Sequence, residues 1–142
     1  AYYHELRGQI LLESGRAREA VAPLRRAVQL APGAAPIRTL LGQALVASND
    51  PRLLDEAIKT LNAAASREPD MTDAYRHLAM AYGRKGEIGQ AELASAQAFM
   101  IAGDTKNAQT QAYRAMAKLP KGSPAYLKAE DILNADHYGL EK

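Results

Sequence analysis

Apolar and small residues recur along this chain three, four and seven positions apart, a spacing that places them on one face of an α-helix. The segment from Ala20 through Leu24 to Ala27 is an example. No run alternates polar and apolar residues long enough to form a strand. Asp50-Pro51 and Ser123-Pro124 are typical of helix starts. The pattern predicts an all-α chain of about eight helices, at 2–14, 17–30, 35–47, 52–67, 71–84, 88–102, 105–118 and 123–135.

The predicted helices come in pairs, because the same order of small and large residues returns along the chain. Three blocks share it, and Pro32, Pro69 and Pro120 are expected to stop helices. We expect the small residues to lie where the two helices of a pair cross. They are Gly8, Gly42 and Ala79 on the first helices and Ala20, Ala57 and Ala91 on the second. The residues expected to fill the space between the helices are Leu11, Leu45 and Tyr82.

This skeleton resembles the tetratricopeptide repeat (TPR), a hairpin of about 34 residues with the pattern W-x2-L-G-x2-Y, A-x3-F and P. The resemblance covers roughly residues 1–122, with His4 in place of Trp and Arg7 in place of Leu. The second block is longer than usual, and the extra residues fall in SNDPRLLDEA. The resemblance implies a TPR-type α–α superhelix, a right-handed solenoid. One domain at 1–136 would hold hairpins at about 1–34, 35–71, 72–102 and 103–136, before a frayed tail at 137–142.

Two similar turns lie only half a repeat apart. GEIGQA begins at Gly86 and GDTKNA at Gly103. The helix between them can therefore be the second helix of one hairpin or the first helix of the next. The many alanines of this helix give it small side chains on several faces. We interpret residues 88–108 as a phase change, after which the array is no longer regular. On this interpretation the regular groove ends near Arg84, and a ligand site lies upstream of Gly86.

Composition excludes several classes of function. The chain has no cysteine, which removes disulfides, thiol catalysis and cysteine zinc sites. Net charge is +2 with no block of Lys or Arg, so we expect no nucleic-acid partner. No apolar run is long enough to span a bilayer, and we expect no membrane insertion. The arginine-rich run around Arg16, Arg18, Arg25 and Arg26 is expected to be a solvated outer face, with partner docking as the alternative.

Catalytic and metal-binding patterns are missing from the sequence. His4-Glu5 begins like HExxH, but the second ligand position is Gly8, so the zinc motif fails. His137 lies in the tail, and we assign it no role. We find no nucleophile elbow and no phosphate loop. We therefore predict no catalytic, cofactor-binding or metal-binding residue and no cofactor.

First-helix positions that are not needed for packing within a hairpin should line the concave face of such an array. For His77 a plain solvated position is the alternative to ligand contact. The mixture is polar and lacks the Lys and Asn carboxylate clamp of chaperone-binding TPR domains. The predicted peptide groove consists of Tyr2, Glu5, Gln9, Thr39, Gln43, Val46, Arg76, His77 and Met80.

Longer phrases resemble one particular setting. They are YYHELRGQILLESGRAREAVAPLRRAV, LLGQALVASNDPRLLDEAIKTL, DAYRHLAMAYGRKGEIGQAELASAQAFMIAGDTKNAQ and LPKGSPAYLKAEDIL. Together they are similar to the C-terminal repeat region of bacterial periplasmic HExxH zinc metalloproteases of outer-membrane quality control. In that family the protease domain precedes the repeats, so no catalytic residue carries over. The resemblance implies a periplasmic helper region that packs on the protease or recruits its substrates and assembly partners.

Three hypotheses about function follow. The first is a non-catalytic module that binds a protein or peptide segment in the groove. The second is a structural brace whose groove packs against the parent's own protease domain. The third, an enzyme in its own right, has no motif in its favour. Neither the bound partner nor the oligomeric state follows from the sequence.

Overall fold

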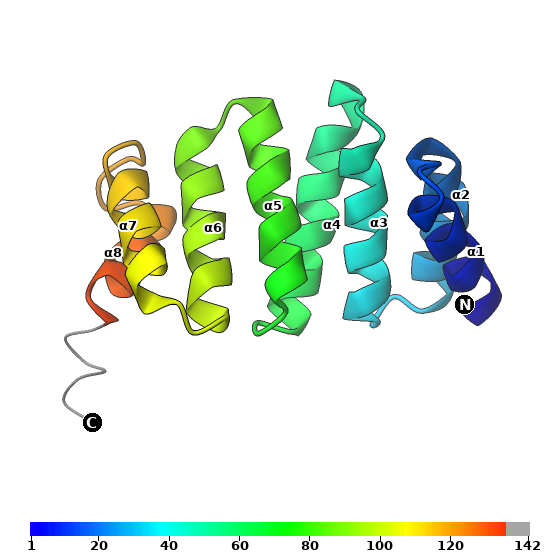
Figure 1. The fold of residues 1–142 in the computed structure, drawn as a ribbon, viewed down its shortest axis with the longest axis horizontal. Helices are drawn as coiled ribbons and strands as arrows, with labels where there is room; N and C mark the ends of the chain where they lie inside the picture. The colour runs from blue at the N-terminus through cyan, green and yellow to red at the C-terminus, as the bar shows by residue number, and fades with distance from the viewer. Residues whose placement is uncertain (136–142) are drawn as a thin grey trace.

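All regular structure in this computed structural model is helical within residues 1–135, the part of the chain that the structure describes (Figure 1). The prediction of an all-α chain is therefore confirmed. The predicted tail at 137–142 and His137 lie outside the described residues. The helices are α1 (Tyr2–Glu13), α2 (Ala17–Leu30), α3 (Ala35–Ala47), a 3-10 turn η1 (Pro51–Leu53), α4 (Leu54–Arg67), α5 (Thr72–Lys85), α6 (Ile88–Ile101), α7 (Thr105–Met116) and α8 (Pro124–Leu133).

Each helix packs against the next one along the chain, so that the hairpins follow one another in a row (Figure 1). This arrangement is compatible with a helical repeat. A first cluster of buried residues extends from α2 to α6 and includes Leu24, Leu45 and Leu61. A second joins α6, α7 and α8 around Leu93 and Leu119. Because α6 contributes to both clusters, it links the two parts of the core.

In each of the first two hairpins, the two helices cross closely at a glycine of the first helix. A Cβ atom added to Gly8 would lie 2.6 Å from Cδ2 of Leu24. A Cβ atom on Gly42 would overlap Leu61 in the same way. Both leucines are fully buried and cannot move aside. The expectation that these glycines mark helix crossings is confirmed.

Later helix pairs carry alanine in place of glycine on the first helix and a smaller residue in place of leucine on the second. Ala79 pairs with Ser95 in the sequence register, and Ala96 pairs with Ala112. Ala96 and Ala112 are both fully buried in the same cluster. The alanine on the first helix is larger than glycine, and the residue that faces it on the second helix is smaller than leucine. The two changes together keep the helices close without overlap.

The longer second hairpin places its extra residues in the turn between α3 and α4. The Asp50 side chain accepts a hydrogen bond from the Arg52 backbone N–H at 3.0 Å, which caps η1. Asn49 adopts the left-handed conformation, with φ of 55°. Arg18 donates to the Ser48 carbonyl at 2.9 Å, and Arg84 donates to the Val46 carbonyl and to Asn49 Oδ1. Side chains from α2 and α5 therefore satisfy the carbonyl end of α3.

The two turns that resemble each other in sequence also have the same geometry. Gly86 and Gly103 are both left-handed, with φ of 86° and 82°. Glu87 donates its backbone N–H to Tyr82, and Asp104 donates to Phe99, each at 2.9 Å. This is the hydrogen-bond pattern of a helix that ends in a glycine and reverses direction. The sequence echo therefore reflects two equivalent helix reversals on either side of α6.

Contacts between alternate helices change at α6. Up to that point the odd-numbered helices meet, since α1 contacts α3 and α3 contacts α5. Beyond it α6 contacts α8, and within the described residues no comparable contact joins α5 to α7. The change falls inside the segment 88–108. Beyond this segment the contact between alternate helices joins the even-numbered helices α6 and α8, whereas in the first hairpins it joins odd-numbered helices.

The crossing at Gly42 generates a stability prediction. We expect Gly42→Ala to lower the free energy of unfolding by about 1–3 kcal/mol, because the new methyl overlaps buried Leu61. On a Leu61→Ala background the same change should cost much less, since the space is then open. Urea unfolding of the wild type, the two single variants and the double variant measures this coupling.

Gly83→Ala is the matched control, because it also adds a methyl inside a helix. A Cβ atom there meets nothing within 4 Å, so we expect no loss and a gain of up to about 1 kcal/mol. Equal destabilisation at Gly42 and Gly83 would show that close crossing is not what requires glycine at position 42.

Candidate functional site

Two of the nine predicted groove residues are buried in the helix packing. Thr39 is 7% exposed, and its hydroxyl donates to the Ala35 carbonyl at 3.0 Å and contacts Met71 Sδ. Val46 is 2% exposed and belongs to the first core cluster. The prediction that both side chains line an open groove is therefore wrong. The reason is that α3 packs against α5, which closes this strip of α3 to solvent.

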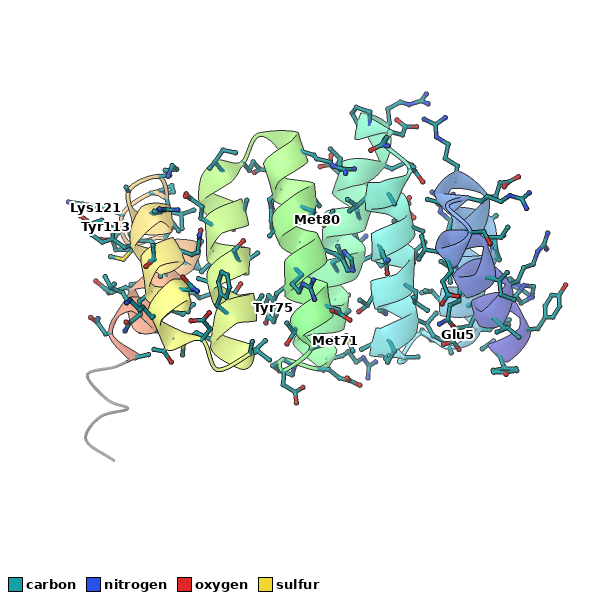
Figure 2. All side chains as sticks on the ribbon, in the orientation of Figure 1. Glu5, Met71, Tyr75, Met80, Tyr113 and Lys121 are labelled. Carbon is teal, nitrogen blue, oxygen red and sulfur yellow. The ribbon has the colours of Figure 1, made fainter. Side chains whose placement is uncertain are left out.

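The other seven predicted groove residues are at least partly accessible. Tyr2, Gln9, Arg76 and Met80 are exposed, whereas Glu5, Gln43 and His77 are half-buried. They are distributed over α1, α3 and α5, and Figure 2 shows Glu5 and Met80 on separate helices. Some already have partners within the chain, since Gln9 donates to Glu13 and Arg76 pairs with Asp73. A ligand role for these seven remains a prediction.

Much of the arginine-rich run is used within the protein. Arg16, the residue that precedes α2, pairs with Glu19 in the first turn of that helix. Arg25 of α2 forms two hydrogen bonds with Glu56 of α4, the shorter at 2.6 Å. Arg18, as described above, caps the end of α3. The run thus contributes contacts between neighbouring helices.

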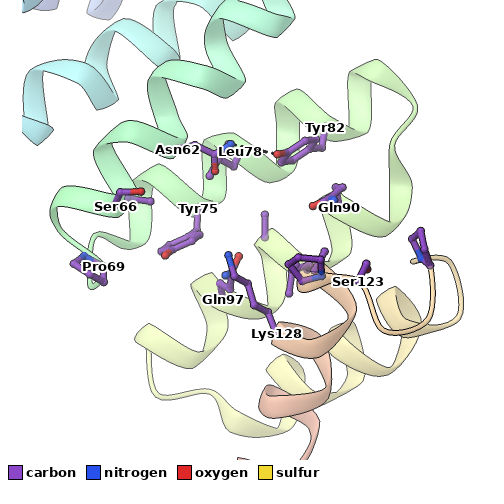
Figure 3. A pocket seen from close by; sticks show the side chains of 16 residues that line it. Asn62, Ser66, Pro69, Tyr75, Leu78, Tyr82, Gln90, Gln97, Ser123 and Lys128 are labelled. Atoms are coloured by element: carbon purple, nitrogen blue, oxygen red, sulfur yellow. Dashed lines mark hydrogen bonds between the residues drawn. The ribbon is translucent and has the colours of Figure 1, made fainter.

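A cavity of about 670 Å³ lies between α4, α5, α6 and the start of α8 (Figure 3). It occupies the region where α4 and α6 make no extensive contact within the described residues. The apolar part of its wall includes Pro69, Leu78, Leu93 and Pro124. None of the nine predicted groove residues lines it. Much of it is formed by residues after Gly86, so it does not lie upstream of that turn.

Polar side chains from four helices surround the cavity (Figure 3). They are Asn62 and Ser66 of α4, Tyr75 and Tyr82 of α5, Gln90 and Gln97 of α6, and Ser123 and Lys128 at α8. Asn62 donates to the Tyr82 hydroxyl at 3.3 Å. Ser123 caps α8 by accepting from the Tyr126 backbone N–H at 3.2 Å. In the described part of the chain, the side chains of Gln90, Gln97 and Lys128 make no hydrogen bond.

Among the described residues, the cavity wall carries charge of one sign, because Lys128 is the one charged residue that lines it. Tyr75 is half-buried, and burial raises the pKa of its phenol, so this hydroxyl stays neutral. A second hollow, lined by Met100, Ile101 and Ile132, shares Tyr75, Gln97 and Lys128 with the cavity. The two form a continuous surface that offers amide hydrogen bonds, the positive charge of Lys128, the negative charge of Asp131 in the second hollow and an apolar extension.

The sequence contains a signal for part of this site. Tyr75 and Tyr82 place two aromatic rings in the third block, at positions held by Arg38 and Leu45 in the second. On the neighbouring helix, Ser95 replaces the large residue that Leu24 and Leu61 supply earlier. Large residues on α5 next to small ones on α6 indicate irregular packing. The contribution of α8, which comes from far along the chain, has no such signal.

Comparison with known proteins does not assign the chain to a group. No family model matches the sequence, and no curated protein matches it. Within residues 1–135 no group of three His, Asp or Glu side chains is placed to hold a metal ion. No described helix is both long enough and apolar enough to cross a membrane. The arrangement of groups around the cavity suits noncovalent binding.

His77 generates a pH prediction. Burial lowers the pKa of its imidazole below the ordinary value of 6.5, and Arg76 lowers it further, against an opposing effect of Asp73. The unfolded chain therefore takes up this proton first as the pH falls. The contribution of neutral His77 to stability is complete above about pH 6.5 and is lost as the pH falls below it.

We expect wild-type protein to lose more of its free energy of unfolding between about pH 7.5 and about pH 5 than His77→Gln does. Urea unfolding at both values measures the difference. Because His4 and His137 are present in both proteins, their contributions cancel. The same loss in both proteins would show that the His77 imidazole titrates normally.

Proposed function

We propose that this chain is a non-catalytic protein-interaction module that binds an extended polypeptide segment in the cavity between α4, α5, α6 and α8. The observation that carries this proposal is the cavity itself. Its volume of about 670 Å³ is in the range of ligand sites, and its wall combines apolar surface with convergent polar groups. This replaces the predicted groove as the main site, because Thr39 and Val46 of that groove are buried.

The chemistry of the wall favours a peptide as ligand. Gln90, Gln97 and Asn62 each offer an amide donor and an amide acceptor, which match the N–H and C=O groups of an extended backbone. Lys128 would attract a carboxylate from an acidic side chain or a chain end. The apolar extension around Met100 and Ile132 would hold a neighbouring apolar side chain.

The tetratricopeptide fold and the metalloprotease setting are part of the same proposal. The close glycine–leucine contacts at Gly8–Leu24 and Gly42–Leu61 support a tetratricopeptide-type superhelix for the first hairpins. A role as the C-terminal region of a bacterial periplasmic zinc metalloprotease rests on the resemblance of the quoted phrases alone. In that setting the module would recruit substrates or assembly partners. The alternative is a brace on the parent's protease domain.

A peptide array tests the site. Binding of array-selected peptides to the chain should weaken roughly fivefold in Gln97→Ala, since a net hydrogen bond is worth about 1 kcal/mol. Lys128→Glu should weaken it further, most of all at low salt. Fluorescence anisotropy measures both. Gln43→Ala is the matched control, because it removes an amide from the predicted groove and should leave binding unchanged.

The opposite pattern of effects on binding would indicate that peptides bind in the predicted groove. Loss of binding in Gln43→Ala and Met80→Ala, with none in Gln97→Ala, would contradict the cavity proposal. Failure of every peptide to bind would instead favour the brace. Zinc-dependent peptidase activity that stays with the chain through repeated purification would overturn the non-catalytic assignment.

A further inference from the structure

The cavity and the second hollow both follow one stripe of α6. Gln90, Gln97 and Ile101 belong to this stripe, because spacings of seven and four residues bring side chains to the same face of a helix. Gln90 lines the cavity, Ile101 lines the second hollow, and Gln97 lines both. Between Gln90 and Ile101 the helix rises about 16 Å, a length that about five residues of an extended chain cover. The two hollows together are therefore long enough for such a segment.

On the opposite wall, α8 carries two charges of opposite sign. Lys128 lines both hollows, whereas Asp131 lines the second hollow alone. The two residues are three positions apart and are neighbours on the helix surface. Within residues 1–135, however, neither of them forms an ion pair, with the other or with a third side chain. The charge of the site therefore changes from positive where the hollows meet to negative in the second hollow.

This order of charges favours the interior of a polypeptide over its C-terminal end. The site continues past Lys128 into the second hollow, where Met100, Ile101 and Ile132 provide apolar surface. A terminal carboxylate held by Lys128 would leave that surface empty and would lie near the like charge of Asp131. An acidic side chain can pair with Lys128 while its backbone continues into the second hollow.

We propose that the site selects an internal segment in which an acidic and a basic residue are two positions apart, with an apolar residue between them. This proposal rests on the peptide-binding function proposed above. The acidic side chain pairs with Lys128 and the basic one with Asp131. Alternate side chains of an extended chain point the same way, about 6–7 Å apart, which matches the roughly 5–6 Å between neighbours on a helix face. The intervening side chain points away from α8, toward Met100 and Ile101 of α6.

An array of end-blocked peptides tests this charge pattern. Each peptide is long enough to span both hollows and has the core Glu-x-Lys, Lys-x-Glu, Glu-x-Glu or Glu-x-Ala, where x is apolar and the flanks are randomised. Both orders are included because the bound chain can run in either direction. A further set ends in a free carboxylate in place of the acidic side chain. Fluorescence anisotropy at low salt measures affinity for wild type, Asp131→Lys and Glu130→Lys.

Glu130→Lys is the matched control for Asp131→Lys. It makes the same change of charge at the adjacent position of α8, and Glu130 lines neither hollow. Asp131 is exposed and Glu130 is partly exposed, so both variants should fold, which circular dichroism checks.

We expect wild type to bind one order of the Glu and Lys core roughly fivefold more tightly than Glu-x-Glu, which is the effect of a strong exposed ion pair. Asp131→Lys should reverse this preference by about the same factor, while Glu130→Lys should keep it. Peptides with a free terminal carboxylate should bind wild type more weakly than the preferred core. The preference should decrease as salt is added, because salt screens exposed charges.

The results that would overturn the charge pattern differ from those that would overturn the binding site. If Gln97→Ala weakens binding but Asp131→Lys leaves the preference unchanged, the charge pattern is wrong and the cavity remains the site. Tightest binding by peptides with a free carboxylate would also contradict it. A gain in affinity with loss of the preference on deletion of residues 136–142 would assign the second hollow to the chain's own end. If Gln97→Ala has no effect on the affinity of any peptide, both proposals fail.

Discussion

The close approach of paired helices at a small residue is the constraint on which the rest of this structure depends. At Gly8 and Gly42 the partner helix supplies a buried leucine that occupies the space of the missing side chain. This contact sets the distance between the helices of a hairpin, and that distance decides which residues of the next hairpin can pack. Short helices such as these are marginal alone and gain most of their stability from such packing.

The pair of residues at which two helices cross changes along the chain, and this change explains why the array does not stay regular. From Gly8–Leu24 to Ala96–Ala112, the second residue becomes smaller as the first becomes larger. By α6 the helix is small enough to pack on both sides, so it belongs to two core clusters. From this point on, the alternate helices that contact each other are α6 and α8. The cavity lies beside this change, between α4, α5, α6 and the start of α8.

Surfaces that the packing leaves open have different origins. The cavity is open because α4 and α6 lack extensive contact while α8 and two tyrosines form its walls. The outer side of α1 is open because no described helix lies on it, although Tyr3 and Ile10 match buried positions in α3 and α5.

Local sequence by itself determined the helices, their turns and their crossings. Helical periodicity, left-handed glycines and caps such as Asp50 and Ser123 act within a few residues, so they can be identified along the chain. The burial of Thr39 and Val46 could not be predicted in this way, because it depends on α3 packing against α5. The cavity also required the tertiary structure, since its walls come from residues as far apart as Asn62 and Lys128. Periodicity shows that a residue lies on a given face of a helix, but only the contacts between distant helices decide whether that face is open to solvent.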